Sequence, residues 1–319
     1  MGSVMVAVMA GGVAAFVAVG TVASVASGAS GASGASRPPG GELRIHVLEV
    51  DYHAGGGDAI VVADSTVEPA RHVLIDAGDD GAAAGALEAL GVGSLDLLVL
   101  THAHYDHYGG MDEVLDAVPV RAFAFNGQVR AAVTYRRLLD RLREEVATVI
   151  LVDTARTVRL GDAADATVVT LLSPLERHLA ADTDTGDRLN DGSLGVRIDR
   201  GEFSFLTTGD AEEAANRRFV RRYGERLDVD VLKLGHHGSA DATQRFWLDA
   251  TTPAVAIVSA NGTTHPHGRV LRLVRERGIA LFCTPRHGRV TIRVDPAAGG
   301  YEVETERGTG MACRPGSGR

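Results

Sequence analysis

The stretch that most constrains this chain is a histidine-rich turn directly after a hydrophobic run. Residues 95–100 read LDLLVL, a pattern typical of a buried β-strand, and the chain continues as THAHYDHYGG. The turn places the imidazoles of His102, His104 and His107 and the carboxylate of Asp106 at the end of that strand. Such groups are ligands for zinc, iron and manganese, whereas burying them without a cation leaves polar atoms unpaired. We interpret the turn as a metal-binding motif with two ligand pairs, one from the first two histidines and one from Asp106 and His107.

The spacing His-x-His-x-Asp-His-x-Gly-Gly resembles the signature of the metallo-β-lactamase superfamily, and the resemblance extends over residues 42–303. Gly109 and Gly110 predict a sharp bend, which the alternative of a polar surface turn does not explain. The resemblance implies an α+β fold: a four-layer αββα sandwich in which two mixed β-sheets lie between outer helices. It also implies that the ligands lie on loops at one edge of the sandwich.

Two later motifs have counterparts in the same superfamily. A Thr-Gly-Asp sequence ending at Asp210 follows a predicted strand, and it resembles the aspartate that bridges two metal ions. A helix N-cap is the alternative, because Asp is well suited to that position. His236 and His237, flanked by glycines, follow another predicted strand at 228–234. The resemblance implies that His237 is a metal ligand and that His236 faces a substrate oxygen.

Other segments resemble a narrower branch, the hydrolase domain of ComEC-type DNA-uptake competence proteins. Residues 55–62 read GGGDAIVV, with Gly56 where that branch usually has Gln. Lys233, the only lysine of the chain, matches a Lys-x-x-His-His-Gly-Ser motif, and His265 matches a Gly-His-Pro motif. The resemblance implies that Lys233 stabilises charge on substrate oxygens and that His265 donates a proton to the leaving oxygen. A structural role for His265 is the alternative.

Three polar residues outside these motifs are expected to support the site. Asp58 and Asp76 stand at predicted turns, and we expect structural or supporting roles rather than direct metal ligation. Asn190 stands twenty residues before Asp210, where most two-zinc members of the superfamily have a third histidine. A neutral amide is a poor zinc ligand, so Asn190 is expected to be a weak one.

The two predicted pockets are therefore expected to differ in their affinity for a metal ion. The pocket of His102, His104 and Asp210 lacks one strong ligand. The other pocket is complete, with four ligands: Asp106, His107, Asp210 and His237. We expect one or two divalent ions per chain, one tight and one exchangeable. Zinc or manganese is expected, with magnesium as an option at the weaker, oxygen-rich position.

Composition narrows the functional classes. The chain is 45% hydrophobic and 23% charged, which is ordinary for a globular protein, and its formal net charge is −9. This acidity argues against a protein whose main task is to hold nucleic acid on a basic surface. It leaves open the cleavage of a phosphodiester at a metal site.

The chain divides into four predicted regions. Residues 4–25 are apolar or small and long enough to span a bilayer, so residues 1–26 are predicted to be an export signal or a membrane anchor. A mis-assigned start codon is the alternative. A Gly/Ala/Ser-rich linker is predicted at 27–41, the hydrolase domain at 42–305 and a flexible tail at 306–319. We accordingly expect a secreted or extracytoplasmic protein.

Further local predictions concern two helices, one loop and the cysteines. Helices are predicted at 82–90 and 130–146, with the arginines of the second on a solvated face. The acidic loop 181–192 lacks the residue pattern of a calcium loop, so a mobile rim loop is expected. Cys283 and Cys313 have no zinc-type spacing, and their pairing as a disulfide is left open by the sequence.

These observations predict an exported metal-dependent hydrolase acting on a phosphodiester of a nucleic acid or a phosphorylated cell-surface polymer. The metal would lower the pKa of bound water from about 15.7 toward 7. Asp106 is expected to act in catalysis as well as in ligation, and His236 and Lys233 to stabilise charge on the substrate. The alternatives are a lactonase, thioesterase or β-lactamase, which usually carry the third histidine, and a non-catalytic metal-containing surface-binding module. No obligate protein partner is indicated.

Overall fold

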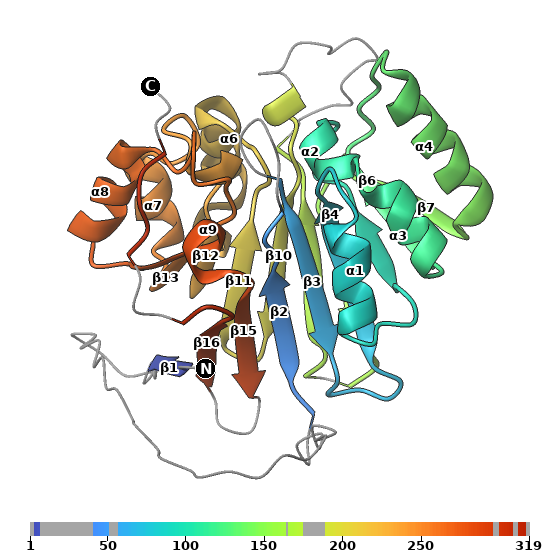
Figure 1. Ribbon diagram of the computed structural model, residues 1–319, viewed down its shortest axis with the longest axis horizontal. Coiled ribbons are helices and arrows are strands. Elements are labelled where there is room, and N and C mark those ends of the chain that lie inside the picture. The colour runs from blue at the N-terminus through green and yellow to red at the C-terminus, as the bar shows by residue number, and fades with distance from the viewer. Residues whose placement is uncertain are drawn as a thin grey trace.

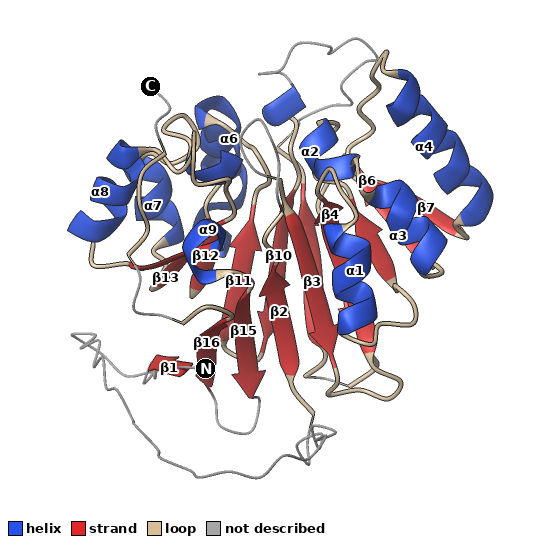
Figure 2. Cartoon of the chain, in the orientation of Figure 1, coloured by secondary structure: helices blue, strands red, loops and turns tan. Residues whose placement is uncertain are grey.

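The fold is a sandwich of two β-sheets with helices on both outer sides (Figure 1; Figure 2). The predicted four-layer αββα arrangement, with two mixed sheets, is confirmed. The computed structural model describes residues 3–6, 41–50, 57–163, 165–174, 189–295, 300–308 and 312–316.

The first sheet contains nine strands among the described residues. Neighbouring strands are antiparallel from β1 to β4 in the spatial order and parallel from β4 to β7. In that order they are β1 (Ser3–Val6), β16 (Gly300–Thr305), β15 (Val290–Asp295), β2 (Leu43–Val47), β3 (Ala59–Asp64), β4 (Arg71–Ala77), β5 (Leu97–Val99), β6 (Ala122–Phe125) and β7 (Thr148–Leu151).

The second sheet contains seven strands in the part of the chain that the structure describes. Its strands are parallel from β14 to β11 and antiparallel from β11 to β8. In spatial order they are β14 (Ala280–Cys283), β13 (Val255–Val258), β12 (Val231–Lys233), β11 (Phe203–Thr207), β10 (Gly195–Arg200), β9 (Thr167–Leu172) and β8 (Arg156–Leu160).

Helices bury the outer face of each sheet, and aliphatic side chains fill the space between the sheets. Figure 1 shows one helical group on each side of the strands. On the first sheet lie α1 (Ala82–Ala89), α2 (Tyr105–Tyr108), α3 (Met111–Ala117) and α4 (Val133–Glu145). On the second lie α6 (Glu213–Tyr223), α7 (Arg245–Thr251), α8 (Gly268–Glu276) and α9 (Thr284–His287), with 3₁₀ turns η1 (Gly224–Leu227) and η2 (His236–Gly238).

The parallel half of each sheet determines where a site can form. Parallel strands end at the same edge of a sheet, and ligands bind in α/β folds beyond those carboxyl ends. The loops after β4 and β5 in one sheet and after β11, β12 and β13 in the other therefore meet at one edge of the sandwich. Hydrogen bonds tie the two sides together there, for example Leu194 N to Thr101 O (3.0 Å).

Local differences from the sequence predictions are few. The helix predicted at 130–146 begins only at Val133, because Arg130 lies in the preceding loop and donates from Nη1 to Ala103 O (3.0 Å). Leu138 and Leu142 of this helix are buried, as an amphipathic helix requires. Of the mobile loop predicted at 181–192, residues 181–188 lie outside the described residues.

The N-terminal prediction remains open. Within residues 1–26 the structure describes only β1, which pairs antiparallel with β16 in the first sheet. The remainder of the predicted signal or anchor, and nearly all of the predicted linker, lie outside the described residues. No helix in the described ranges has the length and apolarity needed to cross a membrane.

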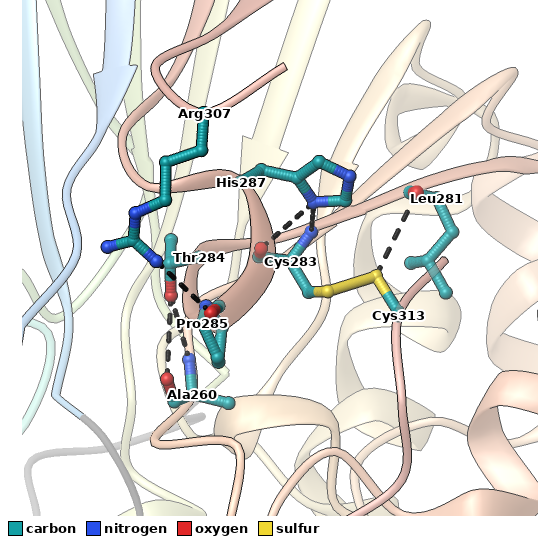
Figure 3. Close-up of a disulfide and its surroundings, with 8 residues drawn as sticks. All are labelled: Ala260, Leu281, Cys283, Thr284, Pro285, His287, Arg307 and Cys313. Atoms are coloured by element: carbon teal, nitrogen blue, oxygen red, sulfur yellow. Dashed lines mark hydrogen bonds between the residues drawn. A yellow bond between two sulfur atoms is a disulfide. The ribbon is translucent and has the colours of Figure 1, made fainter. Parts of the chain in front are cut away.

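A disulfide joins the two cysteines that the sequence left open (Figure 3). It links Cys283, at the end of β14, to Cys313 on the C-terminal segment, so residues 312–316 are attached to the second sheet. Gly316 N donates to Pro266 O (2.9 Å), and this contact places the C-terminal segment against the loop that carries His265.

Candidate metal centre

All of the predicted strong ligands lie on loops at the edge where the parallel strands end. Asp106 and the three histidines of the signature motif lie between β5 and α3, partly within α2. Asp210 follows β11, and His237 follows β12 within η2. The two sheets thus contribute opposite halves of one cluster.

Asp210 lies at the centre of this cluster. Its Oδ2 is 3.3 Å from His107 Nε2 and 3.5 Å from His237 Nε2, and Asp106 Oδ2 is 3.3 Å from the same His237 atom. One ligand atom from each of these four residues lies within 4.8 Å of the others. The structure therefore brings together the pocket that the sequence predicts to be complete.

Three buried ligand atoms of this pocket lack a hydrogen-bond partner among the described residues. His107 Nε2, His237 Nε2 and Asp210 Oδ1 are buried, and none of them has a hydrogen-bond partner in the described part of the chain. Leaving such an atom unpaired costs roughly 1–3 kcal/mol. Ligands about 2.1 Å from a tetrahedral ion are about 3.4 Å from one another, which matches the separations here. The residues therefore fit a divalent metal ion bound by nitrogen and oxygen.

The second predicted pocket shares Asp210 and is less complete. His102 Nε2 lies 2.9 Å from His104 Nδ1 and 3.8 Å from Asp210 Oδ2, so these three residues form a second group of candidate ligands. Asn190 instead donates from Nδ2 to Glu212 Oε1 (2.8 Å). The Asn190 Oδ1 is buried and has no hydrogen-bond partner among the described residues, and its weak ligation stays a prediction.

Supporting groups hold the far side of each imidazole. Asp76 Oδ2 accepts from His107 Nδ1 (2.7 Å), and Ser259 O accepts from His237 Nδ1 (3.2 Å). Each bond places the proton on Nδ1 and leaves Nε2 as a lone-pair donor toward the ion. Asp76 thus has the supporting role that the sequence predicts.

The backbone at the site is strained in three places. Asp76, His236 and His237 have φ angles of 56°, 47° and 53°, in the left-handed region that non-glycine residues rarely adopt. Each such residue costs on the order of 1–3 kcal/mol and persists where the surrounding structure enforces it. Here the strain turns the side chains of Asp76 and His237 toward the cluster.

The two glycines of the signature motif form the turn between α2 and α3 and also serve packing. Gly109 and Gly110 have φ angles of −56° and −82°, which any residue can adopt. A Cβ on Gly110 would lie 2.4 Å from Asp80 O and 2.5 Å from Ala77 O. The glycines therefore stand at the predicted bend, where the lack of a side chain also permits close contact with the loop after β4.

Charge within the cluster favours a bound cation. Burial alone would raise the pKa of Asp210, but His237 and His107 bring it well below its usual value. Burial also opposes protonation of these two histidines, yet Asp210 and the neighbouring carboxylates raise the pKa of both well above the usual value. The buried carboxylates thus demand positive charge, which a divalent ion would supply in place of protons.

Two predicted substrate-facing residues lie at the mouth of the cluster. The His236 side chain is 27% exposed, and its Nε2 lies 3.8 Å from Asp210 Oδ2. His265 stacks on His236 with ring centroids 5.9 Å apart. Burial, His237 and His236 lower the pKa of His265 to about 4, so its imidazole is neutral at pH 7. Proton donation by His265 stays a prediction.

The prediction that Lys233 stabilises charge on substrate oxygens is wrong. Its side chain is fully buried and its ammonium group forms an ion pair with Asp58, so it does not face a substrate. The strand β12 ends at Lys233 and directs it between the sheets, whereas His236 and His237 come after the strand.

Sequence reasoning missed two residues near the mouth. Glu212 Oε1 lies 3.3 Å from His236 Nδ1 and so orients that ring, although Glu212 reads as the acidic first turn of a helix. Arg130, which the sequence placed among solvated arginines, is half-buried and held by Ala103 O beside the histidine turn.

A pair of mixed sheets with a buried cluster of histidines and aspartates at one edge is the architecture of a metallohydrolase. The chain belongs to the metallo-beta-lactamase superfamily, whose domain matches residues 54–262. The resemblance drawn from the motifs is confirmed, including its ComEC-type branch.

Curated relatives match most of this chain but only part of their own length. The chain is 28% identical to ComE operon protein 3 of Bacillus subtilis over 221 residues, which are 68% of this chain and 27% of that protein. It is 30% identical to competence protein ComA of Neisseria gonorrhoeae over 244 residues, 74% of this chain and 31% of that protein. The chain thus spans about a third or less of the length of these relatives.

Among solved structures, the chain is similar to Igni18, a metallo hydrolase from the archaeon Ignicoccus hospitalis. The two are 15% identical, with a TM-score of 0.48, over 79% of this chain and 100% of that one.

Proposed function

We propose that this protein is a metal-dependent phosphodiesterase. The observation that carries the metal dependence is the convergence of His107 Nε2 and His237 Nε2, which have no hydrogen-bond partner among the described residues, on Asp210 Oδ2 at separations suited to one ion. Membership of a metallohydrolase superfamily supports the same reading. Zinc or manganese fits the nitrogen and oxygen donors.

Two groups of residues would hold the ions. The tighter position would use Asp106, His107, Asp210 and His237, and the weaker one His102, His104 and the shared Asp210. A bound divalent ion supplies Lewis acidity, which lets water ionise near neutral pH.

The protein's own groups at the mouth suit an anionic substrate. His236 is partly exposed next to Asp210 and is oriented by Glu212. Burial opposes protonation of His236, but Asp210 and Glu212 raise its pKa above the usual value, and the protonated ring is in place to donate a hydrogen bond to a phosphoryl oxygen. Arg130, held by Ala103 O, adds a guanidinium on the side of the histidine turn. Groups positioned in advance stabilise charge that develops on non-bridging oxygens.

The incomplete second pocket favours a phosphodiester over the other substrates. Lactonases, thioesterases and β-lactamases of this fold usually carry a third histidine where Asn190 stands, and the Asn190 amide is bonded to Glu212. The name of one relative, competence protein ComA, is in keeping with a nucleic acid as the substrate. A phosphorylated cell-surface polymer contains the same bond.

A substrate panel tests this proposal. Metal-loaded protein should hydrolyse bis-p-nitrophenyl phosphate, and Asp210→Ala should lose both metal and activity, whereas the control His72→Gln, at the far end of β4, should keep both. Turnover of only a lactone, a thioester or nitrocefin would overturn the phosphodiesterase proposal. Failure to turn over any of the four would favour a non-catalytic surface-binding module.

We further propose that the protein works outside the cytoplasm, with its N-terminal segment as signal or membrane anchor. The apolar composition of residues 4–25 and the disulfide between Cys283 and Cys313 support this, since disulfides persist in oxidising compartments. Fractionation of cells followed by immunodetection tests it, and recovery only from the cytoplasmic fraction would refute it.

A further inference from the structure

The only lysine of the chain lies inside the protein, beneath the metal centre. Lys233 is fully buried, and its Nζ forms an ion pair with Asp58, which is also buried and stands 175 residues earlier in the chain. Asp58 directly precedes β3 of the first sheet, and Lys233 ends β12 of the second. The pair therefore connects the two layers of the sandwich.

Stability alone does not explain a charged pair in this position. Transferring two charges from water to the interior costs several kcal/mol for each ion, and hydrophobic side chains of similar volume are often equally or more stabilising. The Lys233 ammonium instead faces the Asp58 carboxylate directly, with both side chains buried.

Asp58 contacts the ligand groups of both sheets. Its Oδ1 is buried, has no hydrogen-bond partner among the described residues, and lies 3.5 Å from His237 Nδ1. Its backbone N donates to Asp106 O (3.2 Å), and its O accepts from Gly78 N (2.9 Å). One residue thus touches the histidine turn, the loop after β4 and the imidazole supplied by the second sheet.

We infer that Asp58 and Lys233 form a positioning pair for the metal centre: Lys233 fixes the Asp58 carboxylate, which orients His237 and sets the spacing between the two halves of the ligand set. This inference rests on the proposed metal-binding function. A carboxylate behind a metal-binding histidine fixes the tautomer and the ring orientation, and its loss typically costs 10- to 100-fold in metal affinity.

A charge-neutral double variant separates positioning from stability. Asp58→Asn with Lys233→Met removes both charges while keeping side-chain size, so no unpaired charge is buried. The matched control is Asp96→Asn with Arg71→Met, which removes a partly buried ion pair (2.8 Å) at the opposite end of β4. Full-length proteins are stripped of metal and titrated with Co²⁺, whose visible absorption bands report the ligand geometry. Urea denaturation of the same metal-free samples measures stability.

The positioning role predicts a specific combination of results. The double variant should fold with wild-type stability or better, bind Co²⁺ about 10- to 100-fold more weakly, and show altered absorption bands. The control should match the wild type in affinity and spectrum. Asp58→Asn alone should weaken Co²⁺ binding as much as the double variant does, because the carboxylate is the group that contacts His237.

Two outcomes overturn different claims. If the wild type binds Co²⁺ and the folded double variant binds it with the same affinity and spectrum, Ser259 O alone orients His237 and the positioning role is refuted. If the wild type itself binds no Co²⁺, the proposed metal-dependent function fails, independently of the pair.

Discussion

The carboxylate of Asp76 offers a sharp test of how the metal centre is built. Asp76 accepts three hydrogen bonds: Oδ1 from Thr101 N (2.8 Å), and Oδ2 from Thr101 Oγ1 (2.7 Å) and His107 Nδ1 (2.7 Å). Asp76→Asn preserves the shape but replaces one acceptor oxygen with a donor NH₂ group. If the new NH₂ faces His107, Nδ1 must accept, and the imidazole proton moves to Nε2, the ligand atom. If it faces Thr101 N instead, two hydrogen-bond donors face each other and the bond from Thr101 N is lost.

The magnitude follows from the loss of this one acceptor. Groups behind a metal-binding histidine typically contribute 10- to 100-fold to affinity. That range corresponds to about 1.4–2.7 kcal/mol of binding free energy. Because Asp76 is buried and its hydrogen bonds go to the buried residues Thr101 and His107, no solvent contact is available to replace them.

The assay is competition for Zn²⁺ between the protein and a chromogenic chelator. Asp76→Asn should raise the dissociation constant of the tighter ion by one to two orders of magnitude. The control is Asp64→Asn, which alters another buried aspartate, one that accepts from Thr66 N (2.9 Å) at the other end of β3. The control should keep wild-type affinity. A dissociation constant for Asp76→Asn within twofold of the wild type would refute the tautomer argument.

Three further predictions concern stability and stoichiometry. Burial, with Arg289 and Arg44, lowers the pKa of His46 from 6.5 to about 3. Between these pH values the unfolded chain binds a proton on His46 and the folded protein does not, so the free energy of unfolding should fall by about 1.4 kcal/mol for each pH unit from 6.5 down to 3. Urea denaturation at several pH values measures this dependence. For His46→Gln, the free energy of unfolding should change less steeply with pH, by about 1.4 kcal/mol per pH unit, and an unchanged pH dependence would contradict the prediction. Replacing Cys283 and Cys313 by Ala should lower the free energy of unfolding by about 3–4 kcal/mol, because the disulfide joins residues 30 positions apart. An unchanged urea midpoint would argue against this stabilising role. Asn190→His should tighten the weaker ion and raise the metal content found by elemental analysis; the same content as the wild type would count against the second pocket.

The clustering of the candidate ligands could be predicted because the relevant sequence information is local. Each ligand group follows a hydrophobic run that ends in a polar or glycine-rich turn, as with Asp210 after β11 and His237 after β12. Parallel strands then bring these turns to one edge of the sandwich without further specification. The layers of the fold follow from the same succession of strands and helices.

The features that the sequence did not predict depend on contacts between distant segments. Lys233 looks like part of a substrate-binding motif, and only the packing of the two sheets shows that it reaches Asp58 instead. Arg130 leaves the predicted helix because Ala103 O, on another loop, accepts its hydrogen bond. The strand β8 lies at the edge of its sheet with exposed residues, so it lacks the hydrophobic run that identifies a buried strand.

X-ray diffraction at a metal absorption edge, from crystals grown with Zn²⁺ or Mn²⁺, tests the central claim most directly. The account predicts an anomalous scattering peak bonded to His107 Nε2, His237 Nε2 and the Asp210 carboxylate, within reach of Asp106. A second, weaker peak is expected between Asp210 and His102. Anomalous peaks found only elsewhere on the protein, with these side chains bonded to one another or to water, would contradict it.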